Sequence, residues 1–340
     1  MLLWSDELEG MRLDARRAVD VGLPPILELM GRGDGAEDPS KLSRDEQLAK
    51  ARAAMEMAYL PSPEAELREI AGVPCRVFTP ANPARGIYLH FHGGGMILGD
   101  AEMGDPGNVD LRDRFDLAVV SVNYRLAPEH PYPAGPQDGV AVARWLIEHG
   151  DELVAARAPE LGDGPLPIIT GGESAGGYMA ALVPLWLRDQ PGQETMRRHI
   201  AGMNLVFGVY DWGRSPSQRG LRANDGLDLL DPEGITFFTE CYLPEMSDEE
   251  RRDPAISPAF ADLRGLPPAL MSVGTADHLL DDTLVLAARS TAAGNDVELL
   301  VLPEMPHGFM AIACGMTDVW TKRTYQWFAR ILDGWSSKGE

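Results

Sequence analysis

The fold is decided by the stretch Ile168-Ile169-Thr170-Gly171-Gly172-Glu173-Ser174-Ala175-Gly176-Gly177-Tyr178-Met179-Ala180-Ala181. Its β-branched start predicts a strand, its glycines predict a sharp turn, and its alanine-rich end predicts a helix. The turn contains Gly172-x-Ser174-x-Gly176, which is the spacing of a nucleophile elbow. In such an elbow the serine projects above the sheet, and both flanking positions are glycine because a side chain there would crowd the turn.

The same stretch also predicts half of an anion site. The helix after the turn begins beneath Ser174, so the Ala175 amide and the helix dipole favour a negatively charged oxygen there. An isolated motif of this kind is equally compatible with a glycine-rich turn whose serine only caps the helix. The choice depends on whether the rest of the chain supplies partners for a reactive serine.

The composition is that of a globular protein with a strongly acidic surface. The chain has 340 residues, of which 44% are hydrophobic and 24% charged, and its formal charge is -22. That charge repels polyanions, so we expect neither nucleic acid nor an anionic membrane as a partner. Cys75, Cys241 and Cys314 lie far apart without a Cys-x-x-Cys, which predicts buried free thiols rather than a disulfide framework or a cysteine-based metal site.

The N-terminal residues become acidic at Asp6 and Glu7, with no basic segment followed by an apolar one, so no signal peptide is predicted. No apolar run reaches the length that spans a membrane. A cytoplasmic location is the simplest expectation.

Helical and extended patterns alternate along most of the chain. Two helices are expected before any strand, over residues 5–30 and 47–59, and the capping-box pattern Ser43-Arg44-Asp45-Glu46 introduces the second. Strands are expected over residues 67–70, 75–79, 87–91, 117–122, 203–207, 269–273 and 297–302, and helices over 109–115, 138–148, 279–292 and 319–331. This alternation predicts a mostly parallel sheet flanked by helices on both faces.

The alternation breaks between residues 210 and 255, which we interpret as a cap insertion with at most short helices, such as 234–241. The two N-terminal helices are its expected partners in a helical cap. We therefore predict N-terminal cap helices over residues 1–65 and an α/β catalytic domain over residues 66–340, with residues 210–255 inserted into it.

A reactive serine needs a general base, and His307 is the best candidate. It lies in Pro306-His307-Gly308-Phe309, just past the last expected strand, where the loops of a parallel sheet collect. The other six histidines fit this role less well, because they flank earlier elements or lie between prolines. A histidine base predicts activity that falls in acid, as the imidazole gains a proton.

The carboxylate that orients the base is expected after the strand before that one. Asp277, in Gly274-Thr275-Ala276-Asp277, lies just past a strand end, whereas Asp282 falls inside the next helix. We choose Asp277 and keep Asp282 as a second candidate, and a plain helix cap is the alternative role for Asp277. The chain order Ser174, Asp277, His307 is that of the α/β-hydrolases.

The other half of the anion site is predicted at His92-Gly93-Gly94-Gly95-Met96, directly after the expected strand 87–91. Three consecutive glycines let backbone amides approach a substrate oxygen without obstruction. A phosphate-binding loop is the alternative, but the Lys-Ser/Thr of a P-loop and the spaced glycines of a dinucleotide motif are both missing.

Five motifs together resemble those of the hormone-sensitive-lipase-like family of bacterial esterases, often called family IV. They are His92-Gly93-Gly94-Gly95, Tyr124-Arg125-Leu126-Ala127-Pro128-Glu129, Gly172-Glu173-Ser174-Ala175-Gly176-Gly177, Asp277-x-Leu279 and His307-Gly308-Phe309. The resemblance runs from about residue 70 to the end with compatible spacing, and the N-terminal helices are similar in kind to the family's cap.

The resemblance implies an α/β-hydrolase fold with a helical cap and gives the motif residues their roles. Ser174 would be the nucleophile, His307 its base and Asp277 the partner of that base, and the amides of Gly94, Gly95 and Ala175 would form the oxyanion hole. His92 would hold the glycine loop, and the segment from Tyr124 to Glu129 would be structural. Met96, where aromatic residues are frequent, and Glu173, where aspartate is common, depart from the family pattern.

We therefore expect a serine carboxylesterase that hydrolyses short- to medium-chain esters through an acyl-enzyme, with no metal and no organic cofactor. Its expected partner is a small-molecule ester, and a homodimer is compatible with the family. Candidate wall residues of the substrate pocket are Trp4, Met96, Trp212, Phe237, Phe238 and Phe309. Amides, lactones and acetylated sugars are alternative substrates, and a binding protein or an acyltransferase on the same fold are alternative functions.

Overall fold

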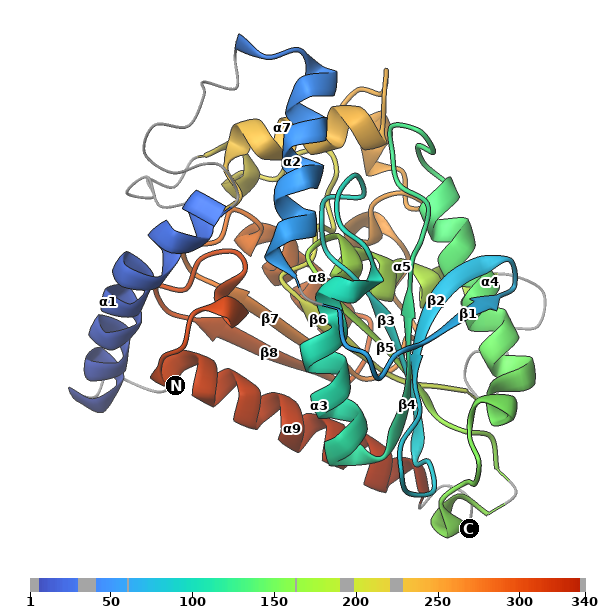
Figure 1. The fold of residues 1–340 in the computed structure, drawn as a ribbon. Coiled ribbons are helices and arrows are strands. Elements are labelled where there is room, and N and C mark those ends of the chain that lie inside the picture. Colours follow the sequence, from blue (N-terminus) through green and yellow to red (C-terminus); the bar gives the residue numbers. More distant parts are fainter. Residues whose placement is uncertain are drawn as a thin grey trace.

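The computed structural model of the chain describes residues 6–29, 41–59, 61–162, 164–189, 199–220 and 229–336 (Figure 1). Within them one sheet is formed by β1 (Glu66–Ile70), β2 (Val73–Phe78), β3 (Gly86–Phe91), β4 (Leu117–Val122), β5 (Ile168–Glu173), β6 (Ile200–Val206), β7 (Ala269–Gly274) and β8 (Val297–Leu302). The strand order in this described part is β1-β2-β4-β3-β5-β6-β7-β8. β2 pairs antiparallel with β1 and β4, and the other pairs are parallel, which confirms the mostly parallel sheet.

The central strands form because their sequences are short, continuous runs of apolar or small residues. Every residue of β3, β4 and β7 is buried. A strand that is buried on both faces needs a layer of helices on each side of the sheet.

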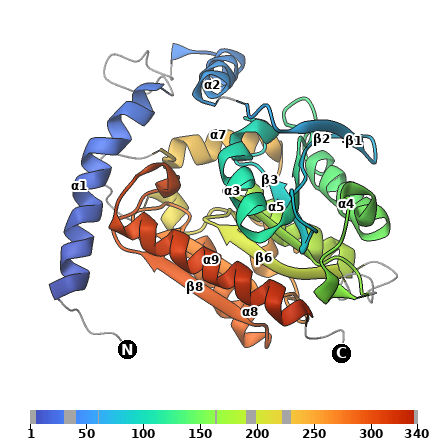
Figure 2. The same ribbon diagram turned by 60° about the horizontal axis from the view of Figure 1, so that its bottom comes forward.

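Helices supply both layers (Figure 2). In the described residues they are α1 (Asp6–Leu29), α2 (Arg44–Ala58), α3 (Asp105–Phe115), α4 (Ala134–His149), α5 (Ala175–Arg188), α7 (Pro232–Tyr242), α8 (Leu280–Ala292) and α9 (Gly315–Ser336). α3 and α9 pack on one face through a cluster that includes Phe115 and Trp327. α4, α5 and α8 cover the other face, where Val142, Met179 and Leu286 belong to a second cluster.

Several helices begin earlier than the sequence pattern predicts, and α3 and α4 do so by a full turn. α3 begins at Asp105 rather than at residue 109, and α4 begins at Ala134 rather than at residue 138. Each first turn contains a proline, Pro106 or Pro136, and proline is tolerated there because the first amides of a helix have no partner within it. Hydrophobic periodicity does not register these turns, because most of their residues are polar, glycine or proline.

α1 and α2 lie outside the two layers (Figures 1 and 2). α1 contacts α9, and α2 lies beside α7, where Arg44 forms an ion pair with Glu240. The predicted capping box of α2 is confirmed, because Ser43 Oγ accepts from the Glu46 amide while the Glu46 carboxylate accepts from the Ser43 amide. The division into a cap and a catalytic domain stays a prediction.

Among the helices of the described residues, none combines the length and the apolarity that crossing a membrane requires.

Candidate active site

The turn between β5 and α5 holds Ser174 in an unusual backbone conformation. Its φ of 56° and ψ of -118° lie outside the common regions for a residue with a side chain. The end of β3 packs against this turn, since a Cβ on Gly172 or on Gly176 would lie 2.2 Å or 1.9 Å from the Phe91 carbonyl oxygen. A side chain is therefore excluded at both flanks, and the segment forms a tight strand-turn-helix.

Loops at the carboxyl ends of β5, β7 and β8 bring Ser174, Asp277 and His307 together. His307 Nε2 lies 2.9 Å from Ser174 Oγ, and His307 Nδ1 lies 2.9 Å from Asp277 Oδ2. The Asp277 side chain is fully buried, whereas 13% of the His307 side chain is exposed. Because a carboxylate only accepts hydrogen bonds, Nδ1–H donates to Asp277 and Nε2 accepts from the Ser174 hydroxyl.

The two candidate carboxylates have separate tasks. Asp277 Oδ1 accepts the Leu279 amide at 2.8 Å, so Asp277 caps its own turn and also contacts His307. Asp282 accepts hydrogen bonds of 2.8 to 2.9 Å from the amides of Tyr210 and Asp211 and from the side chains of Ser215 and Gln218. Asp282 therefore holds the loop that follows β6, and the carboxylate beside His307 belongs to Asp277.

The glycine loop after β3 lies against the elbow. A Cβ on Gly93 would lie 3.6 Å from the Ser174 Cβ. Gly94 and Gly95 have φ values of 111° and 61°, which glycine adopts without strain. Ala175 is the first residue of α5, where an amide has no partner within the helix. The amides predicted to form an oxyanion hole thus come from two chain segments that meet beside Ser174.

His92 fixes the start of the glycine loop as a neutral side chain. Its ring stacks on Tyr124, with the ring centroids 4.2 Å apart, and its Nδ1–H donates to the Gly93 carbonyl oxygen at 2.7 Å. The Tyr124 hydroxyl donates to the His92 carbonyl oxygen at 2.8 Å. Burial lowers the pKa of His92 to about 3, so its ring carries no charge at neutral pH.

Side chains from residues 229–242 reach both sides of the site. A Cβ on Gly95 would lie 2.6 Å from the Phe238 ring of α7, and a Cβ on Gly308 would lie 2.9 Å from Leu229 Cδ1. Phe238 is one of the predicted wall residues. No sequence pattern points to Leu229, because its contact joins residues far apart in the chain. The glycine loop and the histidine loop are thus both covered by this segment.

Most of the other predicted wall residues lie in the core. Met96 and Phe309 are fully buried, and 3% of Trp212 is exposed. Phe237 is half-buried beside Phe238, with the ring centroids 6.1 Å apart. Contact of these side chains with a substrate stays a prediction. Trp4 lies outside the described residues.

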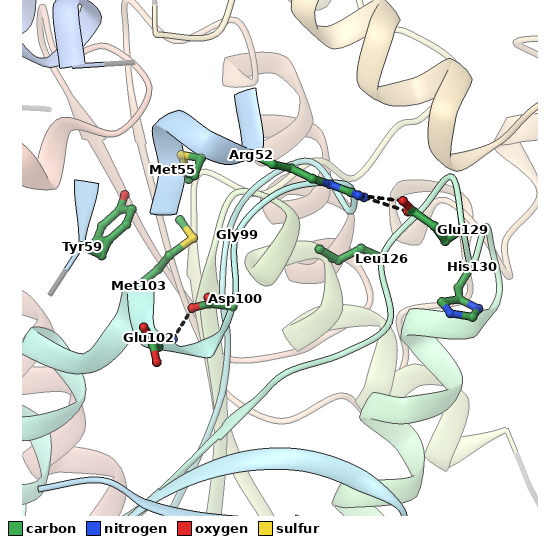
Figure 3. A pocket seen from close by; sticks show the side chains of 10 residues that line it. All are labelled: Arg52, Met55, Tyr59, Gly99, Asp100, Glu102, Met103, Leu126, Glu129 and His130. Carbon is green, nitrogen blue, oxygen red and sulfur yellow. Dashed lines mark hydrogen bonds and ion pairs between the residues drawn. The ribbon is translucent and has the colours of Figure 1, made fainter. Parts of the chain in front are cut away.

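A cavity of about 390 Å³ lies beside α2 (Figure 3). It is lined by Arg52, Met55, Tyr59, Gly99, Asp100, Glu102, Met103, Leu126, Glu129 and His130. The lining segment from Gly99 to Met103 follows the glycine loop in the chain, and neither Gly94 nor Gly95 lines the cavity. The triad side chains do not line it.

Within the described residues, no group of three or more His, Cys, Asp or Glu side chains is arranged to hold a metal ion. The three cysteines are free thiols, as predicted; Cys75 and Cys241 are buried, but Cys314 is only half-buried. Burial raises the pKa of the Cys75 thiol to about 12.

Comparison with known proteins finds relatives along most of the chain. Residues 88–311 match a protein family described by the alpha/beta hydrolase fold. The carboxylesterase NlhH of Mycobacterium tuberculosis strain H37Rv is 36% identical over 253 residues, which cover 72% of this chain and 73% of the relative. The carboxylic ester hydrolase LipN of the same strain is 32% identical over 314 residues, covering 88% and 80%. A crystal structure of a hormone-sensitive lipase from a metagenome library has a TM-score of 0.71 at 29% identity, covering 96% of this chain and 97% of that one.

Proposed function

Because this chain belongs to the α/β-hydrolase family, among its hormone-sensitive-lipase-like carboxylesterases, we propose that it hydrolyses short- to medium-chain esters through an acyl-enzyme on Ser174. The chain is a carboxylic ester hydrolase, like the relatives that cover most of its length. The roles of the individual residues and the size of the acyl group are the content of the proposal.

The position of His307 between Ser174 and Asp277 is the observation that carries the proposal. Both contacts of the imidazole measure 2.9 Å, and they involve its two different nitrogens. The neutral ring with Nδ1–H donated to the carboxylate leaves Nε2 as the acceptor for the serine proton.

In the first half of the reaction, His307 Nε2 takes the Ser174 proton while Oγ attacks the carbonyl carbon of the ester. The carbonyl oxygen becomes an oxyanion, to which the amides of Gly94, Gly95 and Ala175 donate hydrogen bonds. The imidazolium then gives its proton to the alcohol oxygen as the bond between carbon and that oxygen breaks. An acyl group stays on Oγ, and a free alcohol leaves.

In the second half, a water molecule gives one proton to His307 Nε2 while its oxygen adds to the acyl carbon. The same amides hold the second oxyanion. The imidazolium returns the proton to Ser174 Oγ as the carbon–Oγ bond breaks, which releases a carboxylic acid and restores the serine. Asp277 keeps the Nδ1–H hydrogen bond and stabilises the imidazolium in both halves.

One feature supports a short- to medium-chain acyl group. Phe238 and Leu229 lie against the two loops of the site and restrict the space near the nucleophile. This cover favours a small acid component over a long fatty acid.

Initial rates on aryl esters from acetyl to palmitoyl, measured for the natural chain and for Ser174→Ala, test this proposal. We expect rates that peak at short to medium acyl chains in the natural chain and disappear in the variant, while circular dichroism reports an unchanged fold. Hydrolysis that persists in Ser174→Ala would refute the role of this serine. A peak at palmitoyl would refute the assigned acyl length.

A further inference from the structure

A second histidine lies close to the nucleophile without a part in the proposed mechanism. His90, on β3, is buried with 1% of its surface exposed. Its Nε2 lies 3.1 Å from Oε2 of Glu173, the residue directly before Ser174. Because a carboxylate only accepts, Nε2–H donates to Glu173.

The other side of the His90 ring is held by residues of neighbouring elements. His90 Nδ1 lies 2.8 Å from Ser121 Oγ on β4 and 3.3 Å from Asn108 Nδ2 on α3. The Ser121 hydroxyl is also within 3.1 Å of the Ala101 carbonyl oxygen, to which it donates. A Cβ on Gly104 would lie 2.2 Å from the ring, so the imidazole fills a space that exists because residue 104 has no side chain. The ring is therefore fixed in one place.

The two members of this contact lie upstream of the two donor segments of the oxyanion site. His90 precedes the loop that contains Gly94 and Gly95, and Glu173 precedes Ala175 by two residues. Their side chains therefore connect the strand ends from which these two segments diverge.

The backbone pairing between β3 and β5 does not extend to the predicted oxyanion donors. The register between β3 and β5 ends where Phe91 is opposite Gly172, which is before the glycine loop on one strand and before the elbow serine on the other. The hydrogen bond from His90 to Glu173 crosses the end of this ladder.

We propose that Glu173 and His90 form a positioning pair, which holds the two donor segments of the oxyanion site at the separation that the transition state requires. This inference rests on the proposed function of Ser174 and of the oxyanion amides. Separation matters because the donors act at about 2.7–3.1 Å from the oxyanion. The pair touches no reacting atom, so its loss lowers kcat and leaves KM almost unchanged.

The test compares Glu173→Ala, Glu173→Gln and His90→Ala with the natural chain. Alanine at either position removes the contact, whereas glutamine keeps a carbonyl oxygen that accepts from Nε2–H. We expect kcat to fall about tenfold in the two alanine variants, less than the roughly hundredfold loss expected when an oxyanion donor is deleted. The kcat of Glu173→Gln should stay within about twofold of that of the natural chain, and KM should change by less than about twofold in every variant.

The double variant Glu173→Ala/His90→Ala should be no slower than either alanine variant, because all three lack the same contact. The inhibition constant of a trifluoromethyl ketone is a second measurement, and a loss of stability alone would not change it. Ser174 Oγ adds to its carbonyl carbon, and the resulting oxyanion occupies the proposed hole. Its inhibition constant should rise by the factor by which kcat falls.

Tyr325→Phe is the matched control for stability. It removes a hydrogen bond to Asp110 between α9 and α3, far along the chain from the elbow, and should leave kcat and the ketone's inhibition constant unchanged. An unchanged kcat in Glu173→Ala, or an effect seen only as a higher KM, would overturn the positioning role. A Glu173→Gln variant as slow as Glu173→Ala would also overturn it. So would a double variant in which the two single losses of kcat multiply.

Failure of the proposed function would give a different result. In that case Ser174→Ala would keep the hydrolysis of the natural chain, and the ketone would form no adduct with Ser174. Failure of the positioning pair alone leaves hydrolysis dependent on Ser174.

Discussion

At Gly95 the backbone has a φ of 61°, and a Cβ would lie 2.6 Å from the Phe238 ring. Alanine at this position has to displace that ring and adopt a left-handed conformation that costs about 1–2 kcal/mol. The amide of residue 95 would move with the backbone, so we expect Gly95→Ala to lower kcat/KM for an acetyl aryl ester by about tenfold or more.

The control for this prediction is the double variant Gly95→Ala/Phe238→Ala, compared with Phe238→Ala alone. Removing the ring relieves the clash but leaves the backbone conformation, so the loss caused by alanine at position 95 should become smaller without vanishing. An equal loss in the presence and absence of the Phe238 ring would contradict the contact as its cause.

Asp282 should make stability depend on pH in a defined direction. Burial raises the pKa of Asp282 from its ordinary value of 3.8 to about 7, although its hydrogen-bond donors oppose the shift. The folded chain thus binds this proton more tightly than the unfolded chain. The resulting contribution to the free energy of unfolding is fully present below about pH 4 and is lost as the pH rises through about 7.

Asp282→Asn removes this titration. We therefore expect the free energy of unfolding of the natural chain, measured relative to that of Asp282→Asn, to decline between about pH 4 and about pH 8. Urea unfolding at several pH values measures the difference. A difference that stays constant across that interval would contradict the prediction.

The candidate triad could be predicted at the residue scale because its members lie in local contexts that the sequence displays. Ser174 lies between glycines in one turn, and Asp277 and His307 each follow a strand end. The contacts of Phe238 with Gly95 and of His90 with Glu173 could not be predicted, since each joins side chains from different elements. Periodicity reports which face of an element is buried, but not which residue of another element covers it.

At the scale of elements, Arg52 connects α2 to two loops of the catalytic region. Its Nε donates to the Ile97 carbonyl oxygen and one Nη donates to the Ala127 carbonyl oxygen, each at 3.0 Å. The guanidinium also forms two hydrogen bonds with the Glu129 carboxylate, at 2.7 and 2.8 Å (Figure 3). One side chain thus links the helix to the continuation of the glycine loop and to the segment that starts at Tyr124.

Acid should weaken this link. The hydrogen bonds from Arg52 lower the pKa of Glu129 from 4.5 to about 2. A lowered carboxyl pKa contributes stability that is present above the unfolded value and is lost as the pH falls toward 2. Because 53% of the Glu129 side chain is exposed, we expect a contribution of at most about 1 kcal/mol.

Glu129→Gln should remove this dependence on pH. The free energy of unfolding of the natural chain should therefore approach that of Glu129→Gln as the pH falls from about 5 to about 2.5. Urea unfolding at those pH values measures the convergence, and proteolysis within α2 reports whether the helix detaches. If the free energies of unfolding of the natural chain and of Glu129→Gln differ by a constant amount over this pH range, the ion pair contributes nothing to stability.

At the scale of the whole molecule, the cover formed by residues 229–242 should limit the acyl group. Phe238→Ala removes a ring from beside the glycine loop, so the optimum of kcat/KM should shift toward longer acyl chains on the series of aryl esters. Phe237→Ala is the matched control, because Phe237 is the neighbouring aromatic residue on α7. An unchanged optimum in Phe238→Ala, or an equal shift in both variants, would contradict this role.

The fold class could be predicted from the alternation of strands and helices, but the arrangement of the sheet could not. β4 lies between β2 and β3, although β3 precedes β4 in the chain. A local pattern contains no information on which strands become neighbours, because pairing is decided by the packing of the crossover helices. The contact of α1 with α9 joins the two ends of the chain and is equally invisible to a local pattern.

The order of the strands also has a consequence for synthesis. His307 lies 133 positions after Ser174, because the two residues follow β5 and β8. At about 5–20 residues per second, a ribosome needs on the order of ten seconds to make the intervening chain. Throughout that interval the nascent polypeptide carries its serine without the imidazole. In the proposed mechanism, ester cleavage therefore begins only after His307 has been synthesised, late in the production of the chain.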